Sequence, residues 1–552
     1  MRNLLVALLL VITTAAAADA PRRPPEAAIA SAHPLATAAG HAVLNAGGNA
    51  FDAAVAVSAA LSVVEPYSSG LGGGGFFLLH RAADGHEVFV DARERAPFAA
   101  THDMFVDEHG EPDTARMREG ALAAGIPGLP AGLVHLATRY GELPLATSMA
   151  PAIRLAREGF EVDRRFALLT ERTAPLLQRH GTTAFFIDGR PPQAGERLRQ
   201  SDLAVTLEAV AADGARSFYR GEIAARLVDG VREAGGIWTL DDLARYEVVE
   251  RRPLIGHYRG HRIVTAPPPS SGGIVLLATL NILSGFDWDA LDGAARVHLL
   301  AESWRRTYRD RGQYVGDPAF VEVPVAQLTA PAHARVLRGT IDMARATPSA
   351  SLPPVTTRTE STSTTHFSII DVDGNRVAAT QTVNFRYGAG LMPAGTGVVL
   401  NNEMFDFVAR AGTPDGFELV SAEANLVAPG KRPVSSMTPT FIDGPRGVAI
   451  LGTPGGSRII TMVTLAALDW IGGTAPAGIV GRARIHHQYM PDVISYEPGA
   501  ISDELAAALT ARGHTLRDTG RRYGNMNAVT WEFEDNAVNA ATDPRNEALV
   551  DF

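Results

Sequence analysis

The spacing of apolar and polar positions changes along this chain, which indicates a mixture of helices and strands. Short apolar runs at 76–79, 88–92 and 448–451 have the length of buried strands. Between residues 125 and 219, segments such as AGLVHLATRY and SMAPAIRLAREGF repeat apolar residues at helical spacing and are separated by Gly and Pro. The pattern therefore predicts strands accompanied by a large helical scaffold.

A β-hairpin is predicted near residue 370. Phe367–Ile370 has the character of a short buried strand, 371–375 contains an Asp-Gly turn signal, and Arg376–Val383 is the returning strand. The hairpin is preceded by the hydroxyl-rich run STSTT at 361–365. Polar groups capable of chemistry are thus expected at the open end of the hairpin.

Side-chain alternation gathers several of these groups on one face. Thr380, Thr382 and Asn384 lie two residues apart and project from the same side of the returning strand. They should lie close to Thr364 and His366 at the start of the partner strand. Hydroxyls and an amide are therefore predicted to meet in one place.

A threonine hydroxyl needs a neighbouring base to act as a nucleophile. No Ser-His-Asp arrangement is signalled nearby, but cleavage of the Ser363–Thr364 bond would give Thr364 a free α-amino group with a pKa of ~8 beside its own hydroxyl. The alternative interpretation is a polar loop that leads into an exposed strand. Local composition alone favours that alternative, because Ser/Thr loops are common.

A second candidate for chemistry is the segment LGTPGGSRII at 451–460. The strand Val448–Leu451 leads into Gly455 and Gly456, and Ser457 begins an apolar helix. Backbone N–H groups at a tight turn and a helix N-terminus can stabilise developing negative charge. A phosphate-binding turn and a plain strand-to-helix turn are the alternatives, and the absence of a following P-loop lysine weakens the first.

Other suggestive residues have simpler interpretations. His486 and His487 are adjacent, so on a regular element they cannot face one ion together, and the DVDGN segment at 371–375 departs from a calcium loop at later positions. No metal and no cofactor are predicted. Ser270 and Ser271 precede an apolar helix and are expected to cap it.

Composition excludes several classes of protein. The chain has 552 residues, of which 46% are apolar and 20% charged, so it is long enough to fold into several layers or two domains. It has no cysteine, which excludes thiol catalysis, thiolate metal sites and disulfides. A net charge of -10 offers no electrostatic surface for nucleic acid, so small-molecule chemistry is favoured.

The first 20 residues have the pattern of a signal peptide. Arg2 is followed by the apolar run Leu4–Ile12 and by small residues at Ala18 and Ala20. That run is too short to cross a bilayer, and no other stretch approaches the ~20 apolar residues that a membrane span requires. The sequence predicts an exported, soluble protein, periplasmic or secreted, with a signal peptide over 1–20.

Four segments together resemble a known family. These are the threonine stretch at 361–390, NNEMFDF at 401–407, KRPVSSMTPT at 431–440 and LGTPGGSRII at 451–460. In type, order and spacing they resemble the gamma-glutamyltransferase family of N-terminal nucleophile hydrolases. The resemblance extends from about Ala27 to the C-terminus. It implies an α+β fold in a four-layer αββα sandwich, cut into a large subunit (21–363) and a small subunit (364–552) that form one intertwined unit.

The resemblance also implies roles for individual residues. Thr364 is the nucleophile, Thr382 supports it, and Gly455 and Gly456 form the oxyanion hole. The substrate-binding residues it implies are Arg93, Asn384, Glu403, Asp406, Ser435 and Ser436. Arg93, Ser435 and Ser436 would bind the donor's α-carboxylate, and Asp406 with Glu403 its α-ammonium. The family commonly has Asp-Asp-Phe where this chain has Phe405-Asp406-Phe407.

The expected function is hydrolysis or transfer of γ-glutamyl groups through a γ-glutamyl ester of Thr364. Glutathione is the implied donor, and water, amino acids or dipeptides are the implied acceptors. One alternative is a glutaryl β-lactam acylase, which shares the fold but binds no ammonium, and Asp406 argues against it. Another, from a different class, is a non-catalytic periplasmic solute-binding protein. The polar segment between Asp406 and Lys431 resembles the lid loop of some family members.

Overall fold

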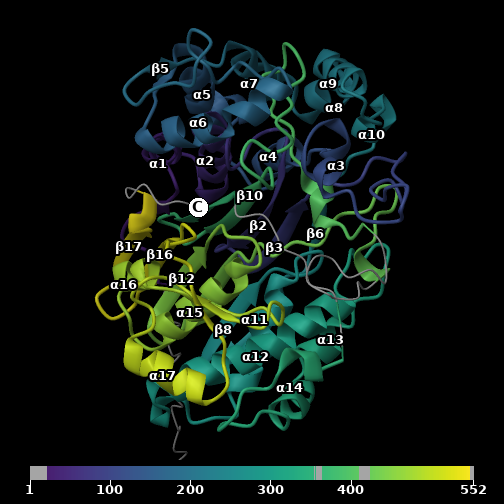
Figure 1. Ribbon diagram of the computed structural model, residues 1–552. Helices are drawn as coiled ribbons and strands as arrows, with labels where there is room; N and C mark the ends of the chain where they lie inside the picture. Colours follow the sequence, from purple (N-terminus) through teal and green to yellow (C-terminus); the bar gives the residue numbers. More distant parts are fainter. Residues whose placement is uncertain (1–21, 354, 356–362, 410–422, 547–552) are drawn as a thin grey trace, which may run out of the picture.

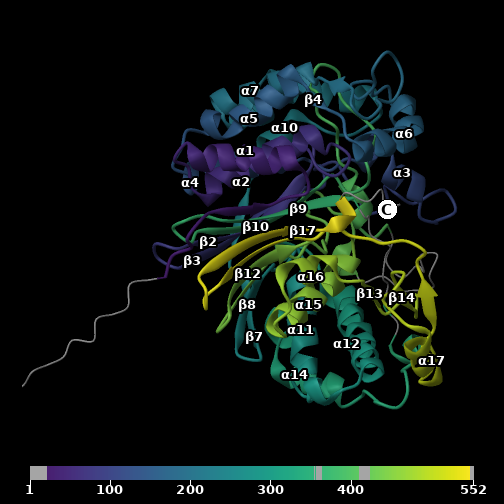
Figure 2. The same cartoon turned by 90° about the vertical axis from the view of Figure 1, so that its left-hand side faces the viewer.

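The protein is built from four layers, as the family resemblance implies (Figure 1). The computed structural model describes residues 22–353, 355, 363–409 and 423–546. In Figure 2 a helical layer, two β-sheets and a second helical layer follow one another. The predicted signal peptide lies outside the described residues. Within them, no helix combines the length and the apolar character that crossing a membrane would require.

The first sheet contains the predicted hairpin. Its six strands are, in spatial order, β1 (Ala28–Ala30), β9 (Thr364–Ile370), β10 (Arg376–Thr382), β2 (Gly74–Arg81), β3 (His86–Ala92) and β6 (Val249–Arg251). All neighbouring strands are antiparallel. In the hairpin, Thr364 pairs with Thr382, and His366 with Thr380. The predicted hairpin and the predicted gathering of these side chains are therefore confirmed.

The second sheet packs face to face on the first. Its six strands are, in spatial order, β17 (Ala537–Thr542), β16 (Asn527–Glu532), β12 (Gly447–Gly452), β11 (Thr440–Gly444), β8 (His261–Thr265) and β7 (Leu254–Tyr258). All these pairs are also antiparallel. The shorter strands β4 (Phe160–Glu161), β5 (Arg197–Leu198), β13 (Ile485–His486), β14 (Ile494–Tyr496) and β15 (Leu516–Asp518) form two small accessory sheets. Both large sheets combine strands that precede and follow residue 363.

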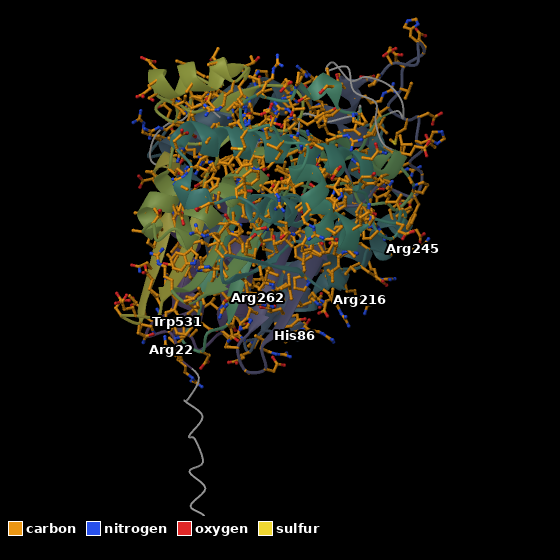
Figure 3. The ribbon with its side chains drawn as sticks, turned by 90° about the horizontal axis from the view of Figure 1, so that it is seen from below. Arg22, His86, Arg216, Arg245, Arg262 and Trp531 are labelled. Carbon is orange, nitrogen blue, oxygen red and sulfur yellow. The ribbon has the colours of Figure 1, made fainter. Side chains whose placement is uncertain are left out.

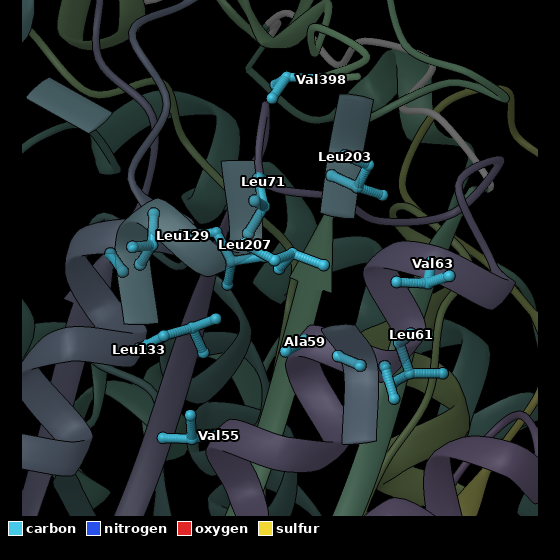
Figure 4. Close-up of a cluster of buried hydrophobic side chains, with 14 of the residues drawn as sticks. Val55, Ala59, Leu61, Val63, Leu71, Leu129, Leu133, Leu203, Leu207 and Val398 are labelled. Atoms are coloured by element: carbon cyan, nitrogen blue, oxygen red, sulfur yellow. The ribbon is translucent and has the colours of Figure 1, made fainter. Parts of the chain in front are cut away.

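One helical layer covers the outer face of the first sheet. It comprises α1 (Pro34–Asn45), α2 (Ala50–Val64), α3 (Thr114–Arg118), α4 (Leu129–Arg139), α5 (Leu145–Glu158), α6 (Arg164–Arg179), α7 (Ser201–Asp213), α8 (Ala215–Arg220), α9 (Glu222–Glu233) and α10 (Leu240–Ala244). Every residue of α2 is buried, because the sheet lies on one side of it and other helices lie on the other. Figure 4 shows Val55, Leu61 and Leu133 in this apolar core.

The other helical layer covers the second sheet. It comprises α11 (Gly272–Leu283), α12 (Gly293–Tyr314), α13 (Val325–Leu328), α14 (Pro331–Arg338), α15 (Arg458–Ile471), α16 (Pro476–Gly481) and α17 (Asp503–Ala511). The apolar helix α11 is buried along almost its whole length, and α12 and α15 pack against it. The apolar helix expected after Ser270 and Ser271 is confirmed.

Ion pairs join the two sheets at the end remote from Thr364. Arg262 of β8 binds Glu87 of β3 at 2.5 Å and Asp443 of β11 at 3.2 Å, and Arg376 of β10 binds Asp443 at 2.5 Å. Arg262 and His86 are labelled at this end in Figure 3. These contacts fix the sheets relative to one another far from the hairpin's open end.

His366 fills the space between the sheets behind the start of β9. Its Nδ1 lies 2.8 Å from Thr380 Oγ1, and its Nε2 lies 3.1 Å from Ser368 Oγ. Because the Ser368 hydroxyl donates to the Asn527 carbonyl, Nε2 carries the imidazole proton and Nδ1 accepts. A Cβ on Gly452 would collide with the ring, so only glycine permits this close approach. Burial lowers the pKa of His366 to about 3.

We expect acidification to destabilise the protein partly through His366. Its folded pKa of about 3 lies below the ~6.5 of an unfolded chain, so the stabilisation is complete above about pH 6.5 and is lost as the pH falls toward 3. At pH 4.5 this group alone would cost about 3 kcal/mol. Melting temperatures of wild type and His366→Gln from pH 7.5 to 4.5 test this: the variant should lose less on acidification, and parallel curves would contradict it.

Candidate active site

The hydroxyl of Thr364 lies beside the bond that the sequence predicts to be cut. Thr364 is the first residue of β9, and its Oγ1 is 3.2 Å from Thr382 Oγ1. Thr382 donates its only hydroxyl proton to the Ser363 carbonyl oxygen at 3.0 Å and accepts the Asn384 N–H at 2.8 Å. Thr364 is therefore the donor between the two threonines. This arrangement polarises the Ser363 carbonyl and holds a hydroxyl next to it.

The opposite face of β9 is anchored to helix α2. Thr365 donates to the Glu65 carboxylate at 2.8 Å, immediately after the helix ends. Glu65 is 1% exposed, and burial raises the pKa of its carboxyl. The pairs between β1 and β9 start at Ser368, so the first residues of β9 depend on β10 and on this anchor.

The predicted strand, glycine turn and helix are confirmed at residues 447–471. β12 ends at Gly452, Ser457 is the residue before α15, and the intervening Gly455 and Gly456 have φ angles of 145° and 58°. Gly456 lines the same pocket as Thr364. Within the described residues, the N–H groups of these two glycines donate to no protein acceptor. They are available to bind an oxyanion.

Arg93, at the end of β3, is held by carboxylates and carbonyls. Its Nη1 binds the Glu403 carboxylate, and its Nη2 donates to Asp406 Oδ2 at 2.7 Å and to the Val434 carbonyl at 3.1 Å. Its Nε donates to the Pro433 carbonyl at 3.3 Å. All three guanidinium nitrogens are thus engaged. A substrate carboxylate at Arg93 must share or displace one of these partners.

Glu94 belongs to this charged cluster, although sequence reasoning missed it. It is fully buried, and one of its carboxylate oxygens is 3.6 Å from Arg93 Nη1. In the described part of the chain, neither carboxylate oxygen of Glu94 accepts a hydrogen bond. Burial raises the pKa of Glu94, and it raises the pKa of Glu403 well above its usual range. Three carboxylates surround one guanidinium, so the cluster has an excess of acidic groups that suits an added cation.

The structure brings the predicted site residues together. Asn384, in a left-handed conformation with φ 77°, donates to the Asn402 carbonyl at 2.9 Å and lies 3.4 Å from Asp406 Oδ1. One small pocket is lined by Arg93, Thr364, Thr382, Asn384, Glu403, Asp406, Ser435, Ser436, Met437, Gly456 and Ile459. Every predicted site residue lines it except Gly455, which is next to Gly456. Glu403 and Asp406 lie on one 3₁₀ turn.

Ser271 has a different role from the predicted one. It occupies the N-cap position of α11, but its hydroxyl caps no helical N–H. It donates instead to the Ser435 carbonyl at 2.8 Å. The prediction of a helix cap was wrong for Ser271, because the chain after β8 runs beside the segment that contains Ser435. It is confirmed for Ser270, whose Oγ accepts the N–H of Gly272, the first residue of α11, at 3.1 Å. The predicted lid falls largely on residues 410–422, outside the described residues, and stays a prediction.

One group of potential metal ligands occurs in the described residues, away from this pocket. Atoms of His298, Glu302 and His514 lie within 4.8 Å of one another. His298 Nδ1 and His514 Nε2 are 2.7 Å apart and share a hydrogen bond, and Glu302 is paired with Arg305 and Arg306. Two adjacent guanidinium groups oppose a bound cation. The group is explained by its own hydrogen bonds and ion pairs.

Comparison with known proteins decides the family. Residues 36–550 match the sequence family described as gamma-glutamyltranspeptidase. The chain belongs to this family. A "Glutathione hydrolase proenzyme" of Escherichia coli is 40% identical over 535 residues, which cover 95% of this chain and 91% of that protein. An "Acylase ACY 1 proenzyme" of a Pseudomonas species (strain V22) is 38% identical and covers 93% and 91%.

A solved structure agrees with the predicted fold. The crystal structure of cephalosporin acylase from Bacillus halodurans superposes with a TM-score of 0.83 at 28% identity, covering 98% of this chain and 99% of that one. The gamma-glutamyltranspeptidase family is a family of enzymes, so this chain is identified with enzymes and not with the solute-binding alternative.

Proposed function

We propose that the protein is a self-processing γ-glutamyltransferase and glutathione hydrolase with Thr364 as its nucleophile. The observation that carries this proposal is the pocket itself. A threonine hydroxyl, Gly456 of the glycine turn and a cluster of opposite charges adjoin one small space. A γ-glutamyl group needs this combination, because its reactive carbonyl is separated by two methylenes from a zwitterion.

Self-cleavage is the first step. Thr364 Oγ1 attacks the Ser363 carbonyl carbon, the C–N bond between the residues breaks, and the new α-amino group takes the hydroxyl proton. Thr382 stabilises the carbonyl oxygen through the hydrogen bond it already makes. Water then hydrolyses the resulting ester. The products are a large subunit, 21–363, and a small subunit that starts at Thr364 and extends to 552.

The freed amine is then the base of the mature site. It takes the proton of the Thr364 hydroxyl as Oγ1 attacks the donor's γ-carbonyl, and Gly455 and Gly456 bind the oxyanion. The amine next protonates the leaving group. Water or the amine of an amino acid or dipeptide attacks the γ-glutamyl ester and releases the enzyme.

The acidic excess around Arg93 supports an amino-acid donor. Asp406 and Glu403 would bind the α-ammonium, with Asn384 beside them, while Ser435 and Ser436 would bind the α-carboxylate. An arriving ammonium compensates carboxylates whose pKa burial raises. Glutathione is the proposed donor, in keeping with the E. coli relative's name, and an exported location follows from the signal-peptide pattern.

A glutaryl β-lactam acylase is the second candidate, and the two acylase relatives favour it. A glutaryl group keeps the carboxylate but lacks the amine. It would leave the three carboxylates around Arg93, two of them buried and that of Asp406 partly buried, without an additional cation. The excess of acidic groups over cations in the cluster therefore supports the γ-glutamyl donor.

Cleavage and activity can be tested on the purified protein. We expect two bands on a denaturing gel, with the smaller one beginning Thr-Thr-His-Phe from Thr364. The cut protein should release the chromophore from a γ-glutamyl 4-nitroanilide faster than from the glutaryl analogue. A single intact band without activity would contradict the proposal, and a preference for the glutaryl donor would favour the acylase.

A further inference from the structure

Arg311 contacts Ser436 directly and Ser435 through Ser271. It lies near the end of α12 and is 9% exposed. Its two serine partners are 125 and 40 positions away in the sequence. Its Nη2 donates to Ser436 Oγ at 3.2 Å, and its Nε donates to Ser271 Oγ at 2.7 Å. Ser271 in turn donates to the Ser435 carbonyl. One buried guanidinium thus supports both pocket serines.

These contacts fix the direction of the Ser436 hydroxyl. A guanidinium has only donors, so Ser436 Oγ accepts from Arg311 and must direct its own proton elsewhere. In the described residues the Ser436 hydroxyl donates to no protein group, and Ser436 lines the pocket. Its proton is therefore available to a ligand.

The hydroxyl of Ser435 also accepts a hydrogen bond and keeps its own proton available, but its donor is different. Its Oγ accepts the N–H of Met437 at 3.1 Å, and a backbone N–H is also only a donor. Over the described ranges, its hydroxyl proton has no protein acceptor either. The pocket therefore offers two adjacent O–H donors, which favour an anion and disfavour a cation.

We propose that Arg311 is the positioning residue of a carboxylate subsite formed by Ser435 and Ser436. By occupying the acceptor side of Ser436, Arg311 leaves the proton of that hydroxyl for the donor's carboxylate. Through Ser271 it also holds the backbone carbonyl of Ser435, whose own hydroxyl is oriented by the Met437 N–H. This inference rests on the proposed γ-glutamyl donor. It deepens that proposal by naming the donors available to the carboxylate. All three nitrogens of Arg93 already have protein partners, whereas the two serine hydroxyls have protons to donate.

The subsite has a consequence for specificity. A carboxylate bound by two serine hydroxyls with a cation behind them receives hydrogen bonds polarised by charge, which are stronger than neutral ones. Arg311 should thus matter for every donor that has this carboxylate, with or without the amine. It should not matter for a donor that has the amine alone.

Three 4-nitroanilides separate these cases: γ-glutamyl, glutaryl, and 4-aminobutyryl, which lacks the carboxylate. For Arg311→Gln we expect kcat/KM to fall about 10- to 100-fold for the first two, mainly through KM, and less than about 3-fold for the third. Ser436→Ala should show the same pattern. The double variant should be little worse than either single one, since Arg311 acts partly through Ser436.

Arg309→Gln is the matched control, because Arg309 lies on the same helix and its Nε donates to the Pro353 carbonyl instead. It should leave all three donors unchanged. Equal losses for the three donors in Arg311→Gln, or an unchanged KM for γ-glutamyl and glutaryl donors, would overturn the inference. If Arg311→Gln does not fold, Ser436→Ala decides by the same comparison. Failure of the proposed function is separate: wild type would then cleave no γ-glutamyl anilide.

Discussion

Thr364→Ala is expected to remain one uncut chain and to have no measurable activity. The methyl group cannot attack the Ser363 carbonyl, so neither the ester nor the free amine forms. The fold should persist, because the hydroxyl of Thr364 makes only a 3.2 Å contact with Thr382, whereas β9 keeps its ladder with β10. A denaturing gel and a γ-glutamyl anilide assay measure both effects.

Thr364→Ser is the control for this variant. It retains a hydroxyl at the same position, so it should still be cut and should keep part of the activity. Splitting of purified Thr364→Ala at the same bond would show that an external protease cleaves the chain, and the self-processing mechanism would then be wrong. Residual activity in an uncut variant would contradict the nucleophile itself.

Asp406→Asn is expected to lower kcat/KM for a γ-glutamyl anilide by ~10- to 200-fold. A charge-assisted hydrogen bond to the donor's ammonium contributes ~1.5 to 3 kcal/mol, and each 1.4 kcal/mol is a factor of ten. The side chain sits where this contact is possible, between Arg93 Nη2 at 2.7 Å and Asn384 Nδ2 at 3.4 Å. The new amide can also turn an N–H toward the ammonium and increase the loss.

A glutaryl anilide, which lacks the amine, should lose much less in the same variant. The preference would therefore shift toward the acylase-type donor. Asp443→Asn is the matched control, since Asp443 also pairs with arginines but lies at the remote end of the sheets. Equal losses for both donors would show that Asp406 maintains Arg93 or the nucleophile, and the substrate assignment would be reopened.

The local sequence pattern was sufficient to predict the parts of the site that depend on strand geometry. The alternation of Thr380, Thr382 and Asn384 predicts their common face, and the observed pairing of Thr364 with Thr382 follows from it. The glycine turn before α15 is equally local, because a strand, two glycines and an apolar helix are adjacent in the chain. Such features depend on neighbours a few residues apart.

Residues whose environment is made by distant segments could not be found this way. Glu94 belongs to a charged run, and such runs are usually solvated; only the meeting of β3 with the segment around Glu403 buries it. Arg311 is one of several arginines on α12, and its contact with Ser436 joins positions 125 residues apart. Burial and long-range pairing of charges leave no periodic signal in a sequence.

Both sheets combine strands from the two proposed subunits, so the cut changes folding from a process within one chain to one that requires two chains to associate. In the first sheet β9 and β10 lie between β1 and β2, and in the second β11 lies beside β8, so each sheet draws on both sides of the proposed cut. The uncut chain assembles these strands intramolecularly, at a rate independent of protein concentration. Once it is cut, the same contacts require two separate polypeptides to meet, and recovery from denaturation then depends on their concentrations. The precursor is thus the form suited to folding, and the mature enzyme retains a structure that its separated pieces would regain only slowly when dilute.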